Sequence, residues 1–428
     1  MRSLVLSSLL ALTSALSVED LYVSEAPSSP RPYILPHYEN SHAVTIGSQL
    51  YRFTVTGPSS DYAFTLMSTN APSSGSLGVL PHIHRTHYEN FFNFKGRFQL
   101  WAQKGDGEQG GRLLTQGDYG SVPRNTTHTF QILDPDTEMV GVIVPGGFED
   151  LFYALGTNYT SGTETPYVPG SSNSSSSSAT GPDSSTISGL QQYDVYAQLD
   201  FTPRRDFVNG SAPSDSGWHT ESDTLGAAGQ PYFIANNYGP KYLNSQYGAY
   251  QIVQPLVTAT QAQDTNYTLS TIIMSRQPSN ATAPTWTAGP AALEVLEGSV
   301  QVQIGEYETA RVEMGDVVFV PKGVTYKYWN EGAQAKVFRF SSVTGGEGRC
   351  FPWSLVLCNI IAILSFYYYH HDNTVFYGTT RVEFNVIARQ ASPFPSRPPD
   401  YQALPPVSFD LLLIAKPGSR PGHGPPGQ

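Results

Sequence analysis

The sequence predicts an all-β protein built from two tandem antiparallel jelly-roll barrels. Aromatic residues make up 12% of the 428 residues, with 26 Tyr and 21 Phe, a composition that favours pleated, half-buried strands. Only 14% of the residues are charged, and 39 Gly and 33 Pro are present, so tight turns are expected and long charged helices are excluded. A local motif recurs after about 198 residues, which predicts an internal duplication with one barrel in each half.

The first barrel is expected over residues 18–160. Between residues 43 and 144 the chain consists of short alternating or aromatic runs separated by Gly, Pro and Asn. Residues 98–102 alternate in this way and are followed by a Gly-Asp-Gly turn, which is the pattern of a strand in a hairpin. The composition then shifts to Ser, Gly, Pro and Thr, which predicts a linker over residues 161–205.

The second barrel is expected over residues 206–345. Its clearest strand alternates Val and Ile with Gln over residues 300–304. The duplication rests on two equivalent strings: Pro123 follows Gly117 after five intervening residues, and Pro321 follows Gly315 at the same spacing. In both strings the residues after the Gly form a short apolar or small-residue strand.

The two ends of the chain are interpreted as segments outside the barrels. Residues 1–17 combine one positive charge with a short apolar run, which is typical of a secretory signal peptide and predicts an extracellular, secreted protein. Residues 346–428 hold both cysteines and are unlike the barrels in composition, so we interpret them as an artefact of the gene model. The apolar run at 352–369 is at the lower length limit of a membrane span, which is the alternative reading.

The net charge and the N-glycosylation sequons allow predictions about binding partners and modification. The formal net charge of -11 argues against nucleic-acid binding, and no membrane partner is expected. The sequence leaves open whether two chains form a homodimer. We expect the sequon at Asn125 to serve a turn with positive φ, and we predict N-glycosylation at the other five, Asn158, Asn173, Asn209, Asn266 and Asn280.

A histidine-rich motif in the first half predicts a metal site. His82 and His84 alternate on a predicted strand and therefore face the same side, and Glu89 and Gly96 complete the pattern H-x-H-x4-E-x6-G. A downstream G-x5-P-x-N-x2-H string ends at His128, which a neighbouring strand would bring to the same place. Three imidazoles and one carboxylate suit Cu, Fe, Mn, Ni or Zn, and the ligand types alone do not choose among these metals.

These two strings resemble the paired motifs of the cupin barrel. Placing the same template on the second half puts Pro284, Trp286, Ala291 and Tyr326 at the ligand positions. None of these side chains can replace its counterpart in an ordinary cupin site. The second barrel is therefore predicted to hold no metal.

Longer strings carry a more specific resemblance, among them Tyr51-Arg52-Phe53, Pro81-His82-Ile83-His84, His87-Tyr88-Glu89-Asn90-Phe91, Gly117-Asp118-Tyr119-Gly120-Ser121-Val122-Pro123-Arg124-Asn125 and Pro145-Gly146-Gly147-Phe148-Glu149-Asp150. With these strings, the chain resembles the fungal, copper-dependent quercetin 2,3-dioxygenases, which are two-barrel cupins, over roughly residues 20–345. We expect the family's C-terminal strand region to be missing or replaced in the tail.

The resemblance implies a function and a site. One Cu(II) per chain would be held by His82, His84, Glu89 and His128 in the first barrel, with other divalent transition metals as alternatives. Glu89 would also be the catalytic base toward a flavonol such as quercetin, which O2 would cleave to a depside and carbon monoxide. The substrate pocket would be lined by Tyr51, Met67, Thr69, Phe91, Phe130, Met139, Ile143 and Phe148.

Two other functions compete with this reading. A manganese-type cupin acting on oxalate, as an oxidase or decarboxylase, would need cationic groups near the metal to bind a small dicarboxylate, whereas the expected pocket is apolar and suits a flat aromatic substrate. A non-enzymatic binding or storage protein with two cupin barrels would have no need of a complete ligand set.

Overall fold

The computed structural model describes residues 16–39, 42–159, 184–213, 218–219, 224–245, 248–287 and 289–342. Most of the predicted signal peptide, the sequon at Asn173 and the whole of segment 346–428 lie outside these residues.

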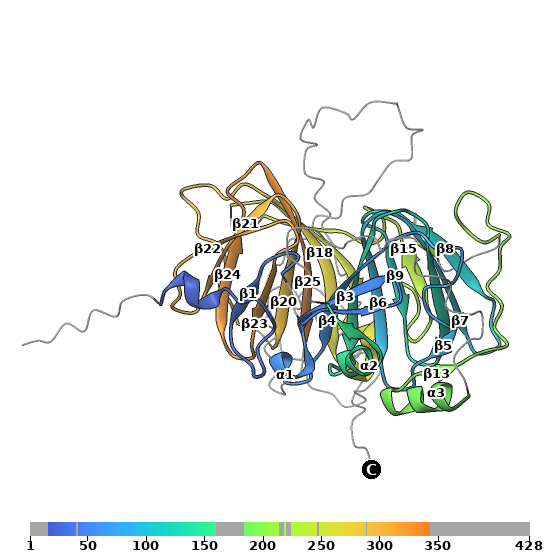
Figure 1. Cartoon of the computed structure of the whole chain (residues 1–428). Coiled ribbons are helices and arrows are strands. Elements are labelled where there is room, and N and C mark those ends of the chain that lie inside the picture. Colours follow the sequence, from blue (N-terminus) through green and yellow to red (C-terminus); the bar gives the residue numbers. More distant parts are fainter. Residues whose placement is uncertain are drawn as a thin grey trace, which may run out of the picture. The chain divides into compact units, whose positions relative to one another are not determined.

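Two sheets form the first barrel, drawn mainly in blue to green in Figure 1. The larger sheet contains β2 (Val44–Ile46), β3 (Gln49–Val55), β4 (Thr65–Ala71), β6 (Tyr88–Lys95), β9 (Tyr119–Val122), β11 (Thr137–Val144), β12 (Thr157–Asn158), β14 (Trp218–His219) and β15 (Tyr232–Ile234). Its strand order is β12-β2-β3-β4-β11-β6-β9-β15-β14. The smaller sheet contains β5 (His82–Ile83), β7 (Phe98–Lys104), β8 (Gly110–Leu114), β10 (Thr126–Ile132) and β13 (Tyr196–Ala197), in the order β13-β5-β10-β7-β8.

The second barrel is also built from two sheets. The larger contains β1 (Tyr33–Leu35), β16 (Tyr242–Asn244), β17 (Gln251–Val257), β18 (Tyr267–Ser275), β20 (Ala291–Glu297), β23 (Val317–Val320) and β25 (Gln334–Ser342), in the order β1-β23-β20-β25-β18-β17-β16. The smaller contains β19 (Trp286–Thr287), β21 (Ser299–Ile304), β22 (Ala310–Glu313) and β24 (Thr325–Trp329), in the order β19-β24-β21-β22. The prediction of an all-β, two-barrel protein is confirmed.

The helices of the described residues are short and occupy connections between strands. They are η1 (Val18–Leu21), α1 (Gly57–Ser60), α2 (Glu149–Leu155), α3 (Ser184–Gly189), η2 (Leu190–Tyr193), α4 (Ala259–Ala262) and η3 (Gln263–Thr265). Helix α1 is capped at its N-terminus by Thr56, whose hydroxyl accepts a hydrogen bond from the backbone N–H of Ser59 in a capping box. None of these helices is long and apolar enough to cross a membrane.

Strand register shows the duplication directly. Glu89 pairs with Val122 on one side and Ile143 on the other. In the second barrel Ala291 pairs in the same way with Val320 and Ser341, so Ala291 is the counterpart of Glu89. The repeat therefore extends from the sequence motifs to the pairing of the strands.

The register also corrects one position of the template. His128 pairs with His82 in the first barrel, and Tyr326 pairs with Trp286 in the second. Trp286, rather than Pro284, is thus the counterpart of the first histidine. Fewer residues separate Trp286 from Ala291 than separate His82 from Glu89. A template with equal spacing in both halves therefore places the counterpart of His82 at Pro284.

The sheets do not divide at the expected domain boundaries. β1 lies within the range expected for the first barrel but pairs with β23 of the second. β15 lies within the range expected for the second barrel but pairs with β9 of the first. Each barrel thus uses a strand from the other's stretch of sequence, because a strand that crosses over satisfies its backbone groups at an edge of the neighbouring sheet.

Side chains of both barrels pack together in one of the apolar clusters of the described residues. The rings of Phe64 and Phe340 have centroids 3.8 Å apart, and those of Phe92 and Phe338 are 5.0 Å apart. A polar contact crosses within this core, where the side-chain amide of Asn90 donates to the Tyr267 hydroxyl at 3.0 Å.

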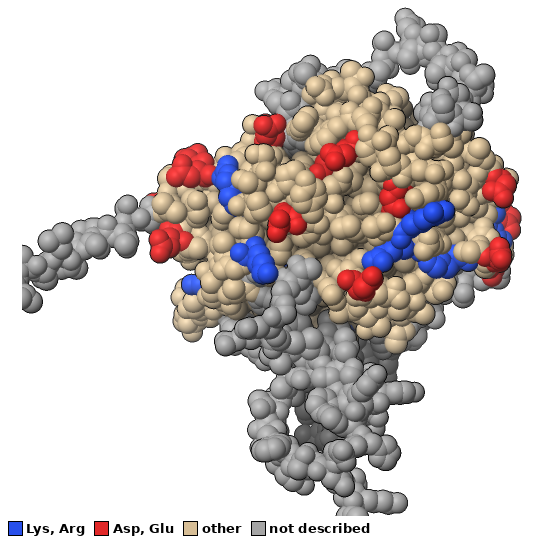
Figure 2. Space-filling view, turned by 90° about the horizontal axis from the view of Figure 1, so that it is seen from below, with Lys and Arg blue, Asp and Glu red and all other residues tan. Residues whose placement is uncertain are grey.

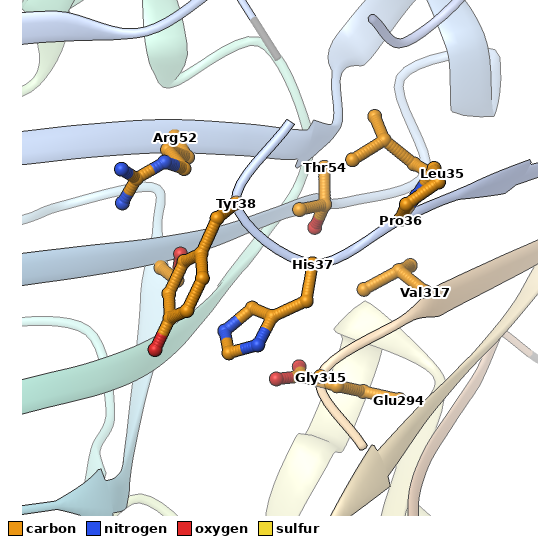
Figure 3. A pocket seen from close by; sticks show the side chains of 10 residues that line it. Leu35, Pro36, His37, Tyr38, Arg52, Thr54, Glu294, Gly315 and Val317 are labelled. Carbon is orange, nitrogen blue, oxygen red and sulfur yellow. The ribbon is translucent and has the colours of Figure 1, made fainter. Parts of the chain in front are cut away.

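A cluster of ionisable side chains lies at the same boundary. Glu138, fully buried, is bonded by the ring of His37 at 3.0 Å and by the hydroxyl of Tyr38 at 2.9 Å. Beside them is a cavity of about 10 Å³, space for about one water molecule, whose lining includes Arg52 and the buried Glu294. Figure 3 shows the His37 and Tyr38 rings side by side at this cavity.

The face seen in Figure 2 carries few charges among the described residues. Small groups of both signs are scattered over it, without a broad basic area in this part of the chain. This agrees with the low charged fraction of the sequence.

Candidate metal centre

Three strands of the first barrel carry three of the predicted ligands. His82 lies on β5 directly opposite His128 on β10, and Glu89 lies near the start of β6. The sequence predicts the fourth, His84, on the same strand as His82, but β5 ends at Ile83 and His84 is the first residue after it. The turn before β10 needs Asn125 in the left-handed region, with φ at 54°, and its N–H donates to the carbonyl of His84 at 2.6 Å. The expectation that Asn125 serves a positive-φ turn is thus met, and the turn ties the two histidine-bearing segments together.

The four side chains meet at one buried point. The Nε2 atoms of His82 and His84 are 3.1 Å apart, and Nε2 of His128 is 2.9 Å from Oε2 of Glu89. Nε2 of His84 is 3.4 Å from Oε1 of Glu89. One nitrogen or oxygen from each of the four residues lies within 4.8 Å of all the others, and each residue is at most 8% exposed.

Backbone carbonyls orient all three rings in the same sense. Nδ1 of His82 lies 2.8 Å from the carbonyl oxygen of Leu80, and Nδ1 of His128 lies 2.9 Å from that of Thr126. Nδ1 of His84 likewise lies 2.8 Å from a carbonyl oxygen. Because a carbonyl only accepts, each Nδ1 carries the hydrogen, and each Nε2 presents a lone pair or a second hydrogen to the centre.

Electrostatics favour a neutral His82 and an ionised Glu89. Burial, together with the neighbouring rings of His128 and His84, lowers the pKa of His82 well below its usual value. Burial opposes the charge on Glu89, but the rings of His84 and His128 outweigh it and hold the pKa of Glu89 well below its usual value. A neutral imidazole and a carboxylate are the forms that bind metal ions.

The donor set fits a transition-metal ion. With Nδ1 protonated, the Nε2 atoms of His82 and His84 face each other at 3.1 Å, where two lone pairs would repel unless a cation or proton lay between them. Three imidazoles and one carboxylate on a rigid sheet match the ligand preferences of copper, iron, nickel and zinc. In the second barrel, Trp286 and Tyr326 occupy the facing positions, and neither side chain offers an equivalent donor.

The predicted pocket residues on the larger sheet share the face of Glu89. Ile143 pairs directly with Glu89, and Met67 and Phe91 both pair with Gly141, two residues before Ile143. Side chains of paired residues project to the same face, and so do residues two apart on one strand. These apolar side chains therefore surround the carboxylate on the inner side of the barrel.

The remaining pocket residues extend this surface. Tyr51, Thr69 and Met139 form one cross-strand row on the same face. The ring of Phe148 meets that of His84 edge-on at 4.9 Å, and Phe130 lies two residues after His128 on β10. All eight predicted residues are buried or half-buried around the centre.

Thr69 adds an unsatisfied polar group to this apolar surface. Its hydroxyl oxygen is buried and has no hydrogen-bond partner among the described residues. A buried hydroxyl without a partner is uncommon, because it loses its hydrogen bonds to water. The Thr69 hydroxyl is therefore available to form one hydrogen bond with a molecule bound inside the barrel.

The sequence did not reveal the contribution of the predicted linker. Residues 184–205 include α3, η2 and β13, and Asp194 from this segment contacts the metal-site loop. His87 lies on that loop, and its Nδ1 is 2.8 Å from Oδ2 of Asp194. An isolated aspartate after a Ser-rich stretch carries no motif, so only the fold brings it to the site.

Comparisons with known proteins identify relatives of this chain. No protein-family model matches the chain. Quercetin 2,3-dioxygenase of Aspergillus japonicus is 64% identical over 355 residues, covering 80% of this chain and 98% of the relative. Quercetin 2,3-dioxygenase of Bacillus subtilis (strain 168) is 34% identical over 137 residues, covering 32% of this chain and 38% of the relative.

Similar solved structures include oxalate decarboxylases. One, a deletion mutant of the Bacillus subtilis protein, has a TM-score of 0.43 over 74% of this chain and 79% of its own. Another, a formate complex from Lactobacillus farciminis, has a TM-score of 0.45 over 74% and 88%. Both are 12% identical to this chain.

The Aspergillus relative also corrects one expectation. It is covered almost end to end, and β25 is present here, paired with β18 and β20. The expectation that the family's C-terminal strand is missing is therefore wrong. With this identity and coverage, the chain belongs to the quercetin 2,3-dioxygenase family.

Proposed function

We propose that this chain is a copper-dependent dioxygenase that cleaves the heterocyclic ring of flavonols such as quercetin with O2, giving a depside and carbon monoxide. The observation that carries the proposal is the buried meeting of three histidines and Glu89 beneath an apolar, partly aromatic surface. The 64% identity to a quercetin 2,3-dioxygenase supports the substrate class.

His82, His84, His128 and Glu89 would hold the ion. When bound, a Cu(II) ion supplies Lewis acidity toward the substrate hydroxyl and a one-electron path between substrate and dioxygen. The three carbonyl contacts at Nδ1 fix the rings before metal arrives, which supports tight binding.

Glu89 would accept the proton of the flavonol 3-hydroxyl at a carboxylate oxygen. A base must be ionised before substrate arrives, and in the metal-free protein the rings of His84 and His128 favour the ionised form of Glu89. Its two oxygens lie against different rings, Oε2 against His128 and Oε1 against His84, so the carboxylate is fixed in place and would lie beside the hydroxyl of a bound flavonol. Once protonated, it would hold the substrate oxygen by a hydrogen bond.

The apolar surface would orient the flat substrate and exclude water. Met67, Met139 and Ile143 offer side chains suited to an aromatic face, and the free hydroxyl of Thr69 offers one polar contact. None of the eight predicted pocket residues carries a positive charge. This favours a flavonol over a small dicarboxylate, which would need a cationic partner.

Aerobic incubation of copper-loaded protein with quercetin tests the proposal. Loss of the flavonol absorption band that depends on both copper and O2 is expected. Absence of turnover by folded, copper-loaded protein would contradict it, and turnover of oxalate instead would replace it with the competing cupin chemistry.

The protein is further proposed to be secreted and glycosylated. The apolar N-terminal run supports secretion. Asn158, Asn209, Asn266 and Asn280 are all exposed, as a glycan requires. Glycosidase treatment of protein from the culture medium should lower its apparent mass, and an unchanged mass would contradict the proposal.

A further inference from the structure

We propose that Asp194, in the segment between the two barrels, is a positioning residue that holds the His84 ring for the metal ion. This inference rests on the proposed metal centre. It assigns a role in metal binding to a segment that the sequence indicates only as a linker.

The carboxylate of Asp194 organises the loop that follows His84. Its Oδ1 accepts a hydrogen bond from the backbone N–H of Arg85 at 2.9 Å. Its Oδ2 accepts from the backbone N–H of Thr86 at 2.8 Å and of His87 at 3.0 Å, and contacts the His87 ring at 2.8 Å. One side chain thus fixes three consecutive residues between the second histidine and Glu89.

The backbone of Asp194 orients the ligand ring itself. Its carbonyl oxygen lies 2.8 Å from Nδ1 of His84, so Nδ1–H donates to it and Nε2 points to the centre. This placement requires the left-handed conformation that Asp194 adopts at the end of η2, with φ at 62°. Asp tolerates that conformation better than most residues.

Neighbouring contacts anchor Asp194 to the metal-bearing strand. In β13, Tyr196 pairs with Ile83 and Ala197 pairs with His82 on β5. The guanidinium of Arg85 lies over the Tyr196 ring at 3.8 Å. The segment is therefore an added edge strand of the metal-bearing sheet, as Figure 1 shows for β13, β5 and the nearby α3.

The two carboxylate oxygens of Asp194 accept three backbone hydrogen bonds and contact the His87 ring. In Asp194→Asn, an NH2 group replaces one oxygen and faces N–H donors, so between one and three of these hydrogen bonds are lost. Asn still tolerates positive φ, so the variant removes the carboxylate without forcing the backbone to change.

The test compares Cu(II) binding by the full-length wild type, Asp194→Asn and Asp194→Gly, which also tolerates positive φ. Asp200→Asn is the matched control, because Asp200 lies in the same segment and is exposed. Competition with a chelator gives the Cu(II) affinity, electron paramagnetic resonance reports the ligand field, and thermal melting of the metal-free proteins reports the fold.

We expect both Asp194 variants to bind Cu(II) about 10- to 100-fold more weakly, with an altered resonance spectrum, while Asp200→Asn matches the wild type. Without the carboxylate, the loop after His84 is no longer tied to residue 194, so the contact between the residue 194 carbonyl and the His84 ring should loosen. Unchanged affinity and spectrum would overturn the inference, even if the metal-free variants melted at lower temperature, because Asp194 would then serve the fold alone. If the wild type itself bound no Cu(II), the proposed copper centre, and not only this inference, would fail.

Discussion

Oε2 of Glu89 lies 2.9 Å from Nε2 of His128, inside a barrel where both residues are buried. The carboxylate is therefore held within the group of rings that would bind the metal ion. A side chain in this position can be both a ligand and a proton acceptor, and substitutions can separate these roles.

Glu89→Gln should lower flavonol turnover by about 100-fold or more, because the amide has nearly the same shape but cannot accept a proton. Initial rates of quercetin loss measure the effect, with Cu(II) content determined in parallel. Glu306→Gln, at an exposed glutamate, is the control and should keep full activity. Full turnover in Glu89→Gln would remove Glu89 as the base.

His128→Ala should abolish stoichiometric Cu(II) binding. A ligand that binds only the folded state at 100 times its Kd stabilises that state by about 2.7 kcal/mol, so chelation should lower the Tm of the wild type but not of the variant. His42→Asn, at an exposed histidine with φ of 51°, should behave as the wild type.

The wild type should bind one ion per chain, because Trp286 and Tyr326 face each other in the second barrel. Two ions per chain, or a chelator response in His128→Ala, would contradict this assignment.

Thr69→Val should raise KM for quercetin by about 5- to 10-fold, as expected for the loss of one hydrogen bond of about 1 kcal/mol. The folded state should be as stable or more stable, because the variant removes a buried hydroxyl that has no partner among the described residues. Steady-state kinetics and thermal melting measure the two effects. An unchanged KM would mean that the hydroxyl does not contact substrate.

Glu294→Gln should stabilise the protein at neutral pH. Burial, and then the charge of Glu138, raises the pKa of Glu294 well above its usual value, so the folded state holds a proton that the unfolded chain releases above about pH 4.5. The cost to stability is absent below that pH, grows as pH rises toward the folded-state pKa and then levels off. A tenfold difference in proton affinity between the folded and unfolded states corresponds to about 1.4 kcal/mol of stability.

The gain in Tm from Glu294→Gln should therefore be larger at pH 7.5 than at pH 4. The control is Glu297→Gln, on the same strand but at an exposed glutamate. Its Tm relative to the wild type should not increase between pH 4 and pH 7.5. An equal gain at both pH values would show that the pKa of Glu294 is not raised in the folded protein.

Much of the fold follows from local sequence. The alternation over residues 300–304 predicts β21, and the Gly-x5-Pro strings predict a duplication that the pairing of Glu89 and of Ala291 reproduces. The histidine motif places His82 and His128 on neighbouring strands, where the structure has them. That they bind metal stays a prediction.

The rest depends on contacts distant in sequence. Nothing in residues 33–35 indicates that β1 joins the second barrel, because an edge strand is chosen by the neighbour that accepts it. Asp194 is 110 positions from His84, whose Nδ1 it contacts through its carbonyl, and no periodic pattern connects them. Glu138 and Glu294 likewise come close only where the two barrels meet, and there the charge of Glu138 adds to burial in raising the pKa of Glu294.

Carbon monoxide release distinguishes the proposed ring cleavage from any other copper-dependent oxidation of a flavonol. Copper-loaded protein, supplied with quercetin and O2, should release one carbon monoxide for each flavonol and each O2 consumed, and metal-free protein should release none. Flavonol loss without carbon monoxide, or release that is independent of copper, would contradict the proposed reaction.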